Sequence, residues 1–301
     1  MRNTELFTLD EKITILGHDN IDVDAFVSGI LLSNLLSYLE IKNEFIILED
    51  VREDDTYLIV KELFDIDMKE YQSKGEDFTR SLFLVDHYKT VHEGDVQACI
   101  DHHPTSEKVD YPFYCCRIAC STSYMVYELM QEVGYEISAE EAKMIVASMM
   151  VDTVSFRSTK TVKEETEKAK EIAKQNGLDY EELERYCLCL TPILDDTPIK
   201  SIINNGYKYY NYNGNKVKSS YIQVYGMVKF ERTMEWVMEI QKEIEKEELA
   251  MWVFIIFDFE KDVTHVHYIE NDGSIEIRKI KKILSRGTDI MPEVESLFST
   301  E

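Results

Sequence analysis

The stretch that organises this chain is Val96-Gln97-Ala98-Cys99-Ile100-Asp101-His102-His103, an apolar run that leads directly into one carboxylate and two imidazoles. Three other apolar runs in the first half end in the same way, at residues 18–24, at residues 86–87 and at Asp152. Strand ends meet at one edge of a parallel sheet, where open α/β sheets bind their ligands, so we expect these side chains to converge. Carboxylates and imidazoles together suit divalent transition metals. The pattern therefore predicts a metal site.

Length, composition and charge narrow the class of protein. The chain has 301 residues, 44% of them apolar, with only 5 prolines and 11 glycines, which is typical of a folded protein of two domains. A net charge of −25 argues against nucleic acid or an anionic membrane as the main partner. There is no signal peptide, no long apolar run and no evident disulfide framework among six cysteines. We expect a cytoplasmic protein with reduced thiols.

The first half of the chain alternates between strand-like and helix-like segments. Short buried strands are predicted at residues 13–16, 44–48, 81–85 and 96–100, and amphipathic helices at residues 24–39, 121–133 and 139–151. This rhythm is typical of a parallel sheet covered by helices. The expected fold class is α/β.

A second, smaller α/β domain is expected after a linker. Residues 190–198 carry two of the five prolines and separate a domain at 1–189 from one at 199–301. Asn213-Gly214 is a strong hairpin signal between strands at 207–212 and 216–224. A charged helix at 232–247 and strands at 250–259 and 264–269 complete the prediction.

The joint pattern resembles the DHH phosphoesterase family, named for the triplet that appears here as Asp101-His102-His103. Segments 17–25, 84–87 and 151–153 are similar to its first, second and fourth motifs. Segments 156–161 and 283–286 resemble the branch that holds manganese-dependent family II inorganic pyrophosphatases, exopolyphosphatases and prune-like proteins. The resemblance implies a phosphoanhydride or phosphoester hydrolase, a small phosphorylated substrate, an active site in the cleft between the domains, and a homodimer.

The resemblance also implies roles for individual residues. One metal ion would be bound by His18, Asp22, Asp86 and Asp152, and the second by Asp24, Asp86, His102 and Asp152. Two divalent cations, manganese first and cobalt or magnesium as alternatives, would share and activate a water. Asp101 would orient a histidine, His103 would face the substrate phosphate, and Arg286 and Lys208 would bind phosphate from the second domain.

The chain departs from the pyrophosphatase pattern near the substrate. The family signature Ser-Arg-Lys-Lys-Gln appears as Ser285-Arg286-Gly287-Thr288-Asp289, so a lysine is lost. Ile21 stands where proline is usual, and Tyr88-Lys89 replaces Asn-Glu. The proposed metal ligands are all retained. Two alternatives therefore stay open: a nucleotide or oligonucleotide phosphodiesterase, and a metal-binding regulatory protein with weak turnover.

Overall fold

The structure is a computed structural model. It describes residues 12–73, 78, 81–103, 105, 107–157, 161, 163–188, 198–224, 230–259 and 261–298. The chain folds as two compact units: the described residues up to 156 and from 161 to 187 form the first, and Arg157 together with the residues from 188 onward forms the second. Of the predicted linker, only Pro198 lies within the described residues. Among the described residues, no helix has the length and apolar character needed to cross a membrane.

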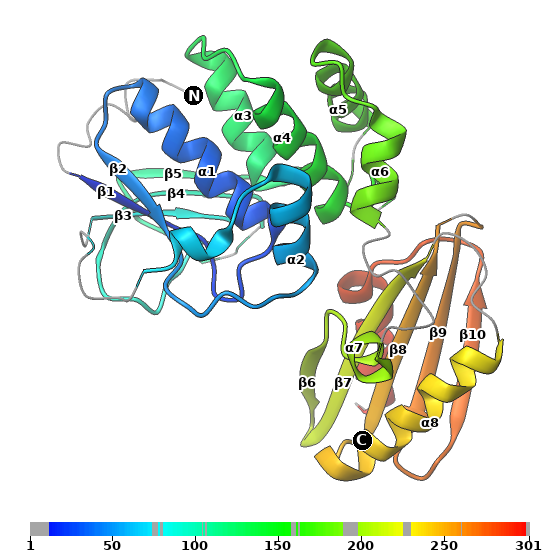
Figure 1. The fold of residues 1–301 in the computed structure, drawn as a ribbon. Coiled ribbons are helices and arrows are strands. Elements are labelled where there is room, and N and C mark those ends of the chain that lie inside the picture. Colours follow the sequence, from blue (N-terminus) through cyan, green and yellow to red (C-terminus); the bar gives the residue numbers. More distant parts are fainter. Residues whose placement is uncertain are drawn as a thin grey trace. The chain divides into compact units, whose positions relative to one another are not determined.

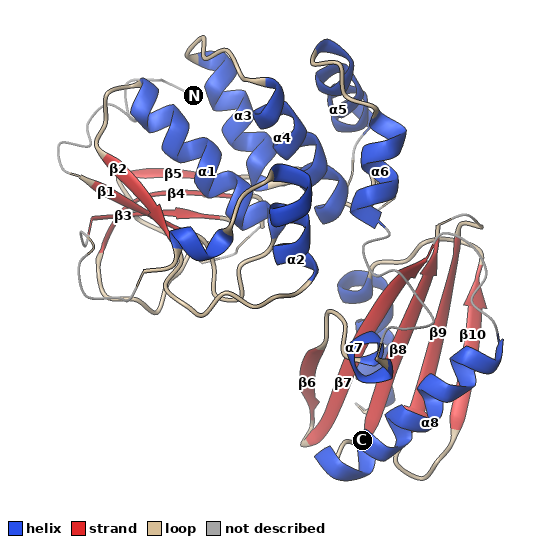
Figure 2. Ribbon diagram, viewed as in Figure 1, coloured by secondary structure: helices blue, strands red, loops and turns tan. Residues whose placement is uncertain are grey.

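The first unit is built on a five-stranded sheet, as Figures 1 and 2 show. All neighbouring strands are parallel and follow the order β2-β1-β3-β4-β5, which confirms the predicted parallel sheet. The strands are β1 (Ile13–Leu16), β2 (Asn43–Ile46), β3 (Ser81–Val85), β4 (Asp95–Asp101) and β5 (Phe113–Cys116). The prediction missed β5, because only four residues of alternating burial mark it.

Three long helices lie over one face of this sheet (Figure 1). They are α1 (Val23–Tyr38), α3 (Thr122–Glu132) and α4 (Ala139–Asp152), all at predicted positions. The opposite face carries no long helix among the described residues. Leu16, Leu82, Leu84 and Cys99 there pack against partly buried aromatic side chains such as Tyr111 and Tyr114. The helices therefore lie on one face of the sheet, and the other face is closed by side chains from loops and an edge strand.

Further elements complete the first unit. Between β2 and β3 lie α2 (Asp55–Leu58), a π-helical turn η2 (Ile59–Leu63) and a 3₁₀ turn η3 (Met68–Tyr71). After α4 come α5 (Lys163–Gln175) and α6 (Tyr180–Leu188). Side chains that cap helix ends define the α3–α4 hairpin: Ser121 accepts from the Tyr124 N–H, and Ser138 and Glu141 form a capping box. Because α4 runs back along α3, its last residues return to the sheet edge where α3 begins.

The second unit is a mixed sheet in the order β10-β9-β8-β7-β6, with β7 and β8 parallel and the other pairs antiparallel. Trp236 of α8 packs on Phe254 within the core that α7 and α8 form with the sheet. Asn213 and Gly214 both have positive φ, which confirms the predicted hairpin turn. The elements are α7 (Ile199–Ile203), β6 (Lys208–Tyr212), β7 (Asn215–Val224), α8 (Phe230–Glu247), β8 (Met251–Asp258), β9 (Val263–Glu270), β10 (Ile275–Ile280), η4 (Arg286–Ile290) and α9 (Met291–Leu297).

Candidate metal centre

The strand order places the candidate site. The chain leaves β1 towards β2 on one side and later returns to form β3 on the other, so β1 and β3 are neighbours with diverging connections. Ligands of open α/β sheets bind at the carboxyl ends of such strands. His18 follows β1 and Asp86 follows β3, and His18 Nε2 lies 3.5 Å from Asp86 Oδ2. Asp86 has a positive φ of 65°, a strained backbone conformation that is common at functional sites.

The start of α1 contributes two carboxylates with different surroundings. Asp22 is the N-cap residue: its Oδ1 accepts from the Ala25 N–H at 3.0 Å, while Oδ2 lies 3.4 Å from His18 Nε2. Asp24 is buried, and it accepts hydrogen bonds from the backbone N–H groups of Thr122 and Ser123 and from the Ser148 hydroxyl. Asp22 therefore both caps the helix and faces His18, whereas Asp24 is fixed by the amino end of α3.

His102 has the geometry of a metal ligand. Its Nδ1 donates to the Ala119 carbonyl at 3.0 Å, so in the neutral ring the lone pair lies on Nε2. That Nε2 atom is buried without a hydrogen-bond partner, and it lies 3.4 Å from Asp86 Oδ1, 3.6 Å from Asp152 Oδ2 and 4.0 Å from Asp24 Oδ2. A lone pair that faces three carboxylates is unfavourable unless a cation lies among them. The donor set therefore fits a divalent metal ion.

Asp152 reaches the cluster from a helix. The sequence pattern grouped it with residues that end strands, but it is the last residue of α4. It arrives because the α3–α4 hairpin returns to the sheet edge. The last turn of α4 contains no basic residue, so Asp152 adds a negative charge to the negative end of the helix dipole. This arrangement also favours a nearby cation.

Asp101 holds the ring of His103. One oxygen of the fully buried Asp101 carboxylate accepts from the His103 backbone N–H at 2.9 Å and from its Nδ1 at 3.0 Å. The His103 side chain is about half exposed, and Nδ1 lies 3.6 Å from Asp86 Oδ1. Because Nδ1 is occupied by Asp101, Nε2 is the ring atom that remains for another partner.

The electrostatics of the cluster reflect its excess of carboxylates. Burial opposes protonation of His18, but its hydrogen bonds and charge interactions with Asp22 and Asp86 raise its pKa to about 11. Burial, followed by the charge of Asp24, raises the pKa of Asp86 well above its usual value. Both groups bind protons more tightly than usual, His18 because of the neighbouring carboxylates and Asp86 because of burial and then the charge of Asp24.

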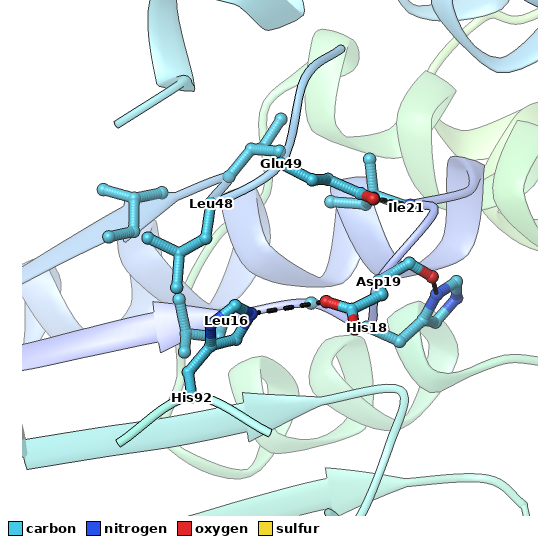
Figure 3. Close-up of a pocket in the computed structure, with 10 residues that line it drawn as sticks. Leu16, His18, Asp19, Ile21, Leu48, Glu49 and His92 are labelled. Atoms are coloured by element: carbon cyan, nitrogen blue, oxygen red, sulfur yellow. Dashed lines mark hydrogen bonds and ion pairs between the residues drawn. The ribbon is translucent and has the colours of Figure 1, made fainter. Parts of the chain in front are cut away.

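A pocket adjoins His18 at the carboxyl ends of β1 and β2 (Figure 3). It encloses about 250 Å³, including space open to solvent. At its rim, His92 Nε2 lies 3.3 Å from Asp19 Oδ1, and Glu49 accepts from the Ile21 N–H. The remaining lining is mainly apolar, from Leu16, Ile46, Ile47 and Leu48. The pocket gives solvent access beside the predicted ligand His18.

The two predicted phosphate-binding residues of the second half both belong to the second unit. Arg286 begins η4, donates a hydrogen bond to the Gly206 carbonyl and stacks over the Tyr221 ring at 5.1 Å. Lys208 begins β6, two residues after Gly206, and is exposed. The segment at residues 206–208 therefore brings Arg286 and Lys208 to the same part of this unit.

Sequence reasoning missed the residues that support the ligands. The Thr122 hydroxyl donates to Asp86 Oδ1, and the Ser148 hydroxyl donates to Asp24 Oδ1. In the sequence, these supporting residues are marked only by the hydroxyl-rich run Ser121-Thr122-Ser123, which predicts no more than the start of a helix. Such residues commonly cap helices, so their type alone does not distinguish the two roles.

Comparisons with known proteins give a family match and several relatives. A model of the DHH family, N-terminal domain, matches residues 12–155. A probable manganese-dependent inorganic pyrophosphatase of Archaeoglobus fulgidus is 24% identical over 97% of this chain and 99% of its own length. Manganese-dependent inorganic pyrophosphatases of Methanocaldococcus jannaschii and Bacillus subtilis are 24% and 22% identical, over 95% of this chain in each case and 99% and 95% of their own lengths.

Solved structures show the same fold. A Methanococcus jannaschii protein described as a family II inorganic pyrophosphatase aligns with a TM-score of 0.67 and 20% identity, covering 96% of this chain and 100% of its own. An exopolyphosphatase-related protein of Bacteroides fragilis aligns with a TM-score of 0.53 and 15% identity, covering 98% of this chain and 94% of its own. The parallel sheet of the first unit lies within the part of the chain that the family model covers. Residues 12–155 therefore resemble an N-terminal domain of the DHH family.

Proposed function

We propose that this protein is a metal-dependent hydrolase that cleaves phosphoanhydride or phosphoester bonds in small phosphorylated molecules. The observation that carries the proposal is the buried Nε2 atom of His102, which faces Asp24, Asp86 and Asp152 without a hydrogen-bond partner. Relatives that match this chain over nearly their whole length are named manganese-dependent inorganic pyrophosphatases. These names support manganese as the metal and pyrophosphate as the reference substrate.

We assign the ligands to two cations. His18, Asp22, Asp86 and Asp152 would hold one, and Asp24, Asp86, His102 and Asp152 the other. The geometry of Asp86 supports this assignment to two cations, since its Oδ2 faces His18 and its Oδ1 faces His102. Bound divalent ions polarise phosphoryl oxygens and lower the pKa of a water that attacks phosphorus.

The other residues would act on the substrate. Asp101 fixes the His103 ring so that its remaining ring nitrogen, Nε2, can face a substrate phosphate. Arg286 and Lys208 supply positive charges that bind phosphate and offset the charge that develops as the bond breaks. Gly287, where related enzymes carry lysine, leaves one fewer cation for this task.

A phosphate-release assay tests the proposal. The metal-stripped protein would be given manganese, cobalt or magnesium and then pyrophosphate, tripolyphosphate, nucleotides or dinucleotides. Manganese-dependent release is expected, and Asp152→Asn should abolish it. Asp19→Asn is a matched control, since Asp19 belongs to the same motif as His18 but pairs with the partly buried His92. Absence of release from every substrate would contradict hydrolysis, and retained metal binding would then favour a regulatory protein.

Assembly and location are part of the same proposal. We propose a homodimer, on the basis of the family resemblance, and a cytoplasmic location, because the six cysteines show no evident disulfide framework. Light scattering of the purified protein tests the dimer directly, since a mass near 35.3 kDa would indicate a monomer instead.

A further inference from the structure

One fully buried residue, Thr122, contacts three of the proposed metal ligands. Its backbone N–H donates to Asp24 Oδ2 at 2.7 Å. Its hydroxyl oxygen accepts from the His102 N–H at 3.2 Å, and the hydroxyl donates to Asp86 Oδ1 at 2.8 Å. Thr122, the first residue of α3, thus connects groups that follow β3, end β4 and begin α1.

The donors and acceptors fix the direction of these bonds. A threonine hydroxyl has one proton, and the His102 amide can only donate to its oxygen. The hydroxyl proton must therefore point at Asp86 Oδ1. That oxygen lies on the His102 side of the carboxylate, and Oδ2 is left facing His18 at 3.5 Å. The hydroxyl thus fixes the orientation of the Asp86 carboxylate, with one oxygen towards His102 and the other towards His18.

Helix capping does not explain this hydroxyl. The N-cap of α3 is Ser121, whose side chain already accepts from the Tyr124 N–H at 3.1 Å. The bonds of the Thr122 hydroxyl go instead to Asp86 and to the backbone of His102. Since removing the hydroxyl leaves every capping bond of α3 intact, its effect on the ligands can be separated from its effect on the helix.

We propose that the Thr122 hydroxyl is a positioning group for the metal centre, which holds the Asp86 carboxylate in the orientation that lets it contact two cations. The inference rests on the proposed function, because it concerns the same site. Groups that orient metal ligands commonly change metal affinity about 10–100-fold when they are removed. The backbone amide of Thr122 remains available to Asp24 in any side-chain variant.

The test compares Thr122→Val with Thr122→Ser. Valine keeps the shape of threonine and removes the hydroxyl, whereas serine keeps the hydroxyl. Manganese binding to each metal-stripped variant would be titrated by calorimetry, alongside thermal unfolding with and without the metal. Thr122→Val should bind manganese about 10–100-fold more weakly, and Thr122→Ser should retain the affinity of the unmodified protein.

A matched control exists in the second unit. Thr264 is also fully buried, and its hydroxyl also donates one hydrogen bond, to the Lys282 carbonyl at 2.7 Å, and accepts one, from the Leu284 N–H at 3.0 Å. Thr264→Val therefore removes a similar pair of bonds, neither of which involves a proposed ligand. It should lower stability and leave the manganese affinity unchanged.

The outcomes separate this inference from the proposed function. If the unmodified protein binds no manganese, the proposed function fails. If it binds manganese and Thr122→Val binds equally well, only the positioning role is overturned. Should Thr122→Val not fold, Thr122→Ala removes the same hydroxyl without adding bulk, and unchanged affinity in that variant would equally overturn the role.

Discussion

The carboxylate of Asp101 accepts two hydrogen bonds from a single residue, His103, through the backbone N–H at 2.9 Å and the ring Nδ1 at 3.0 Å. This pairing fixes the orientation of a ring whose edge is exposed, while Asp101 itself is fully buried. An imidazole held in this way presents the same atom to every substrate molecule.

Replacing Asp101 should therefore affect turnover more than metal binding. We expect Asp101→Asn to lower kcat about 10–100-fold, because the His103 ring loses its charged acceptor. His103→Gln should have an effect at least as large, and the double variant should be no worse than His103→Gln alone. Steady-state kinetics and manganese titration would be measured together. A large fall in manganese affinity for Asp101→Asn would show that Asp101 acts on the metal ligands instead.

Asp86 predicts a pH dependence of stability in the metal-free protein. Burial and the charge of Asp24 raise its pKa above 3.8 in the folded state, so the folded protein binds that proton more tightly than the unfolded chain does. This contribution to stability is complete below the unfolded pKa and is lost as pH rises through the folded pKa. In a chelator, the free energy of unfolding should therefore decline as pH rises above 4.

The variant Asp86→Asn isolates the contribution of Asp86 to stability. It should remove the decline in the free energy of unfolding that comes from Asp86 as pH rises. It should also remove most of the stabilisation by manganese, which for the unmodified protein is about 2.7 kcal/mol at a metal concentration 100 times Kd. Urea unfolding across pH, with chelator or with manganese, measures both effects. An undiminished manganese effect in Asp86→Asn would contradict its assignment as a shared ligand.

Gly287 predicts a substrate preference. With one cation fewer than the pyrophosphatase signature, the protein should stabilise fewer phosphate charges, so pyrophosphate should be a poorer substrate than a less charged phosphoester. Gly287→Lys should raise kcat/KM for pyrophosphate relative to other substrates. No heavy atom lies within 4 Å of a Cβ placed at Gly287, so a side chain can begin there without a clash. Efficient cleavage of pyrophosphate by the unmodified protein would refute the preference.

A side chain at Gly206 is expected to disturb the contacts that hold Arg286. Its φ is +54°, and a Cβ atom there would lie 2.4 Å from Cε1 of Tyr221, the ring on which Arg286 stacks. Gly206→Ala should destabilise the protein by more than the about 1–2 kcal/mol expected from the left-handed conformation alone, and should raise KM. Gly273→Ala is the control, because its φ is +88° with open space around it. Equal effects in urea unfolding would show that Tyr221 moves aside without cost.

The regular parts of the fold could be predicted from local pattern. Four of the five strands of the first sheet and helices α1, α3 and α4 follow from apolar runs and helical periodicity. The Asn213-Gly214 turn follows from chemistry, since both residues tolerate positive φ. The prediction misses β5, which has only four residues, and β10, in which charged residues alternate with exposed isoleucines.

The sequence by itself singled out the candidate metal ligands, because carboxylates and imidazoles follow several separate apolar runs in the first half of the chain. Only the tertiary structure decided how they meet. The strand order sets His18 beside Asp86, and the return of α4 along α3 delivers Asp152 to the strand ends. It also decided that Thr122 contacts groups as distant in the chain as Asp24 and His102. A hydroxyl carries no mark of such a role in sequence, because the role consists of contacts that exist only after the chain has folded.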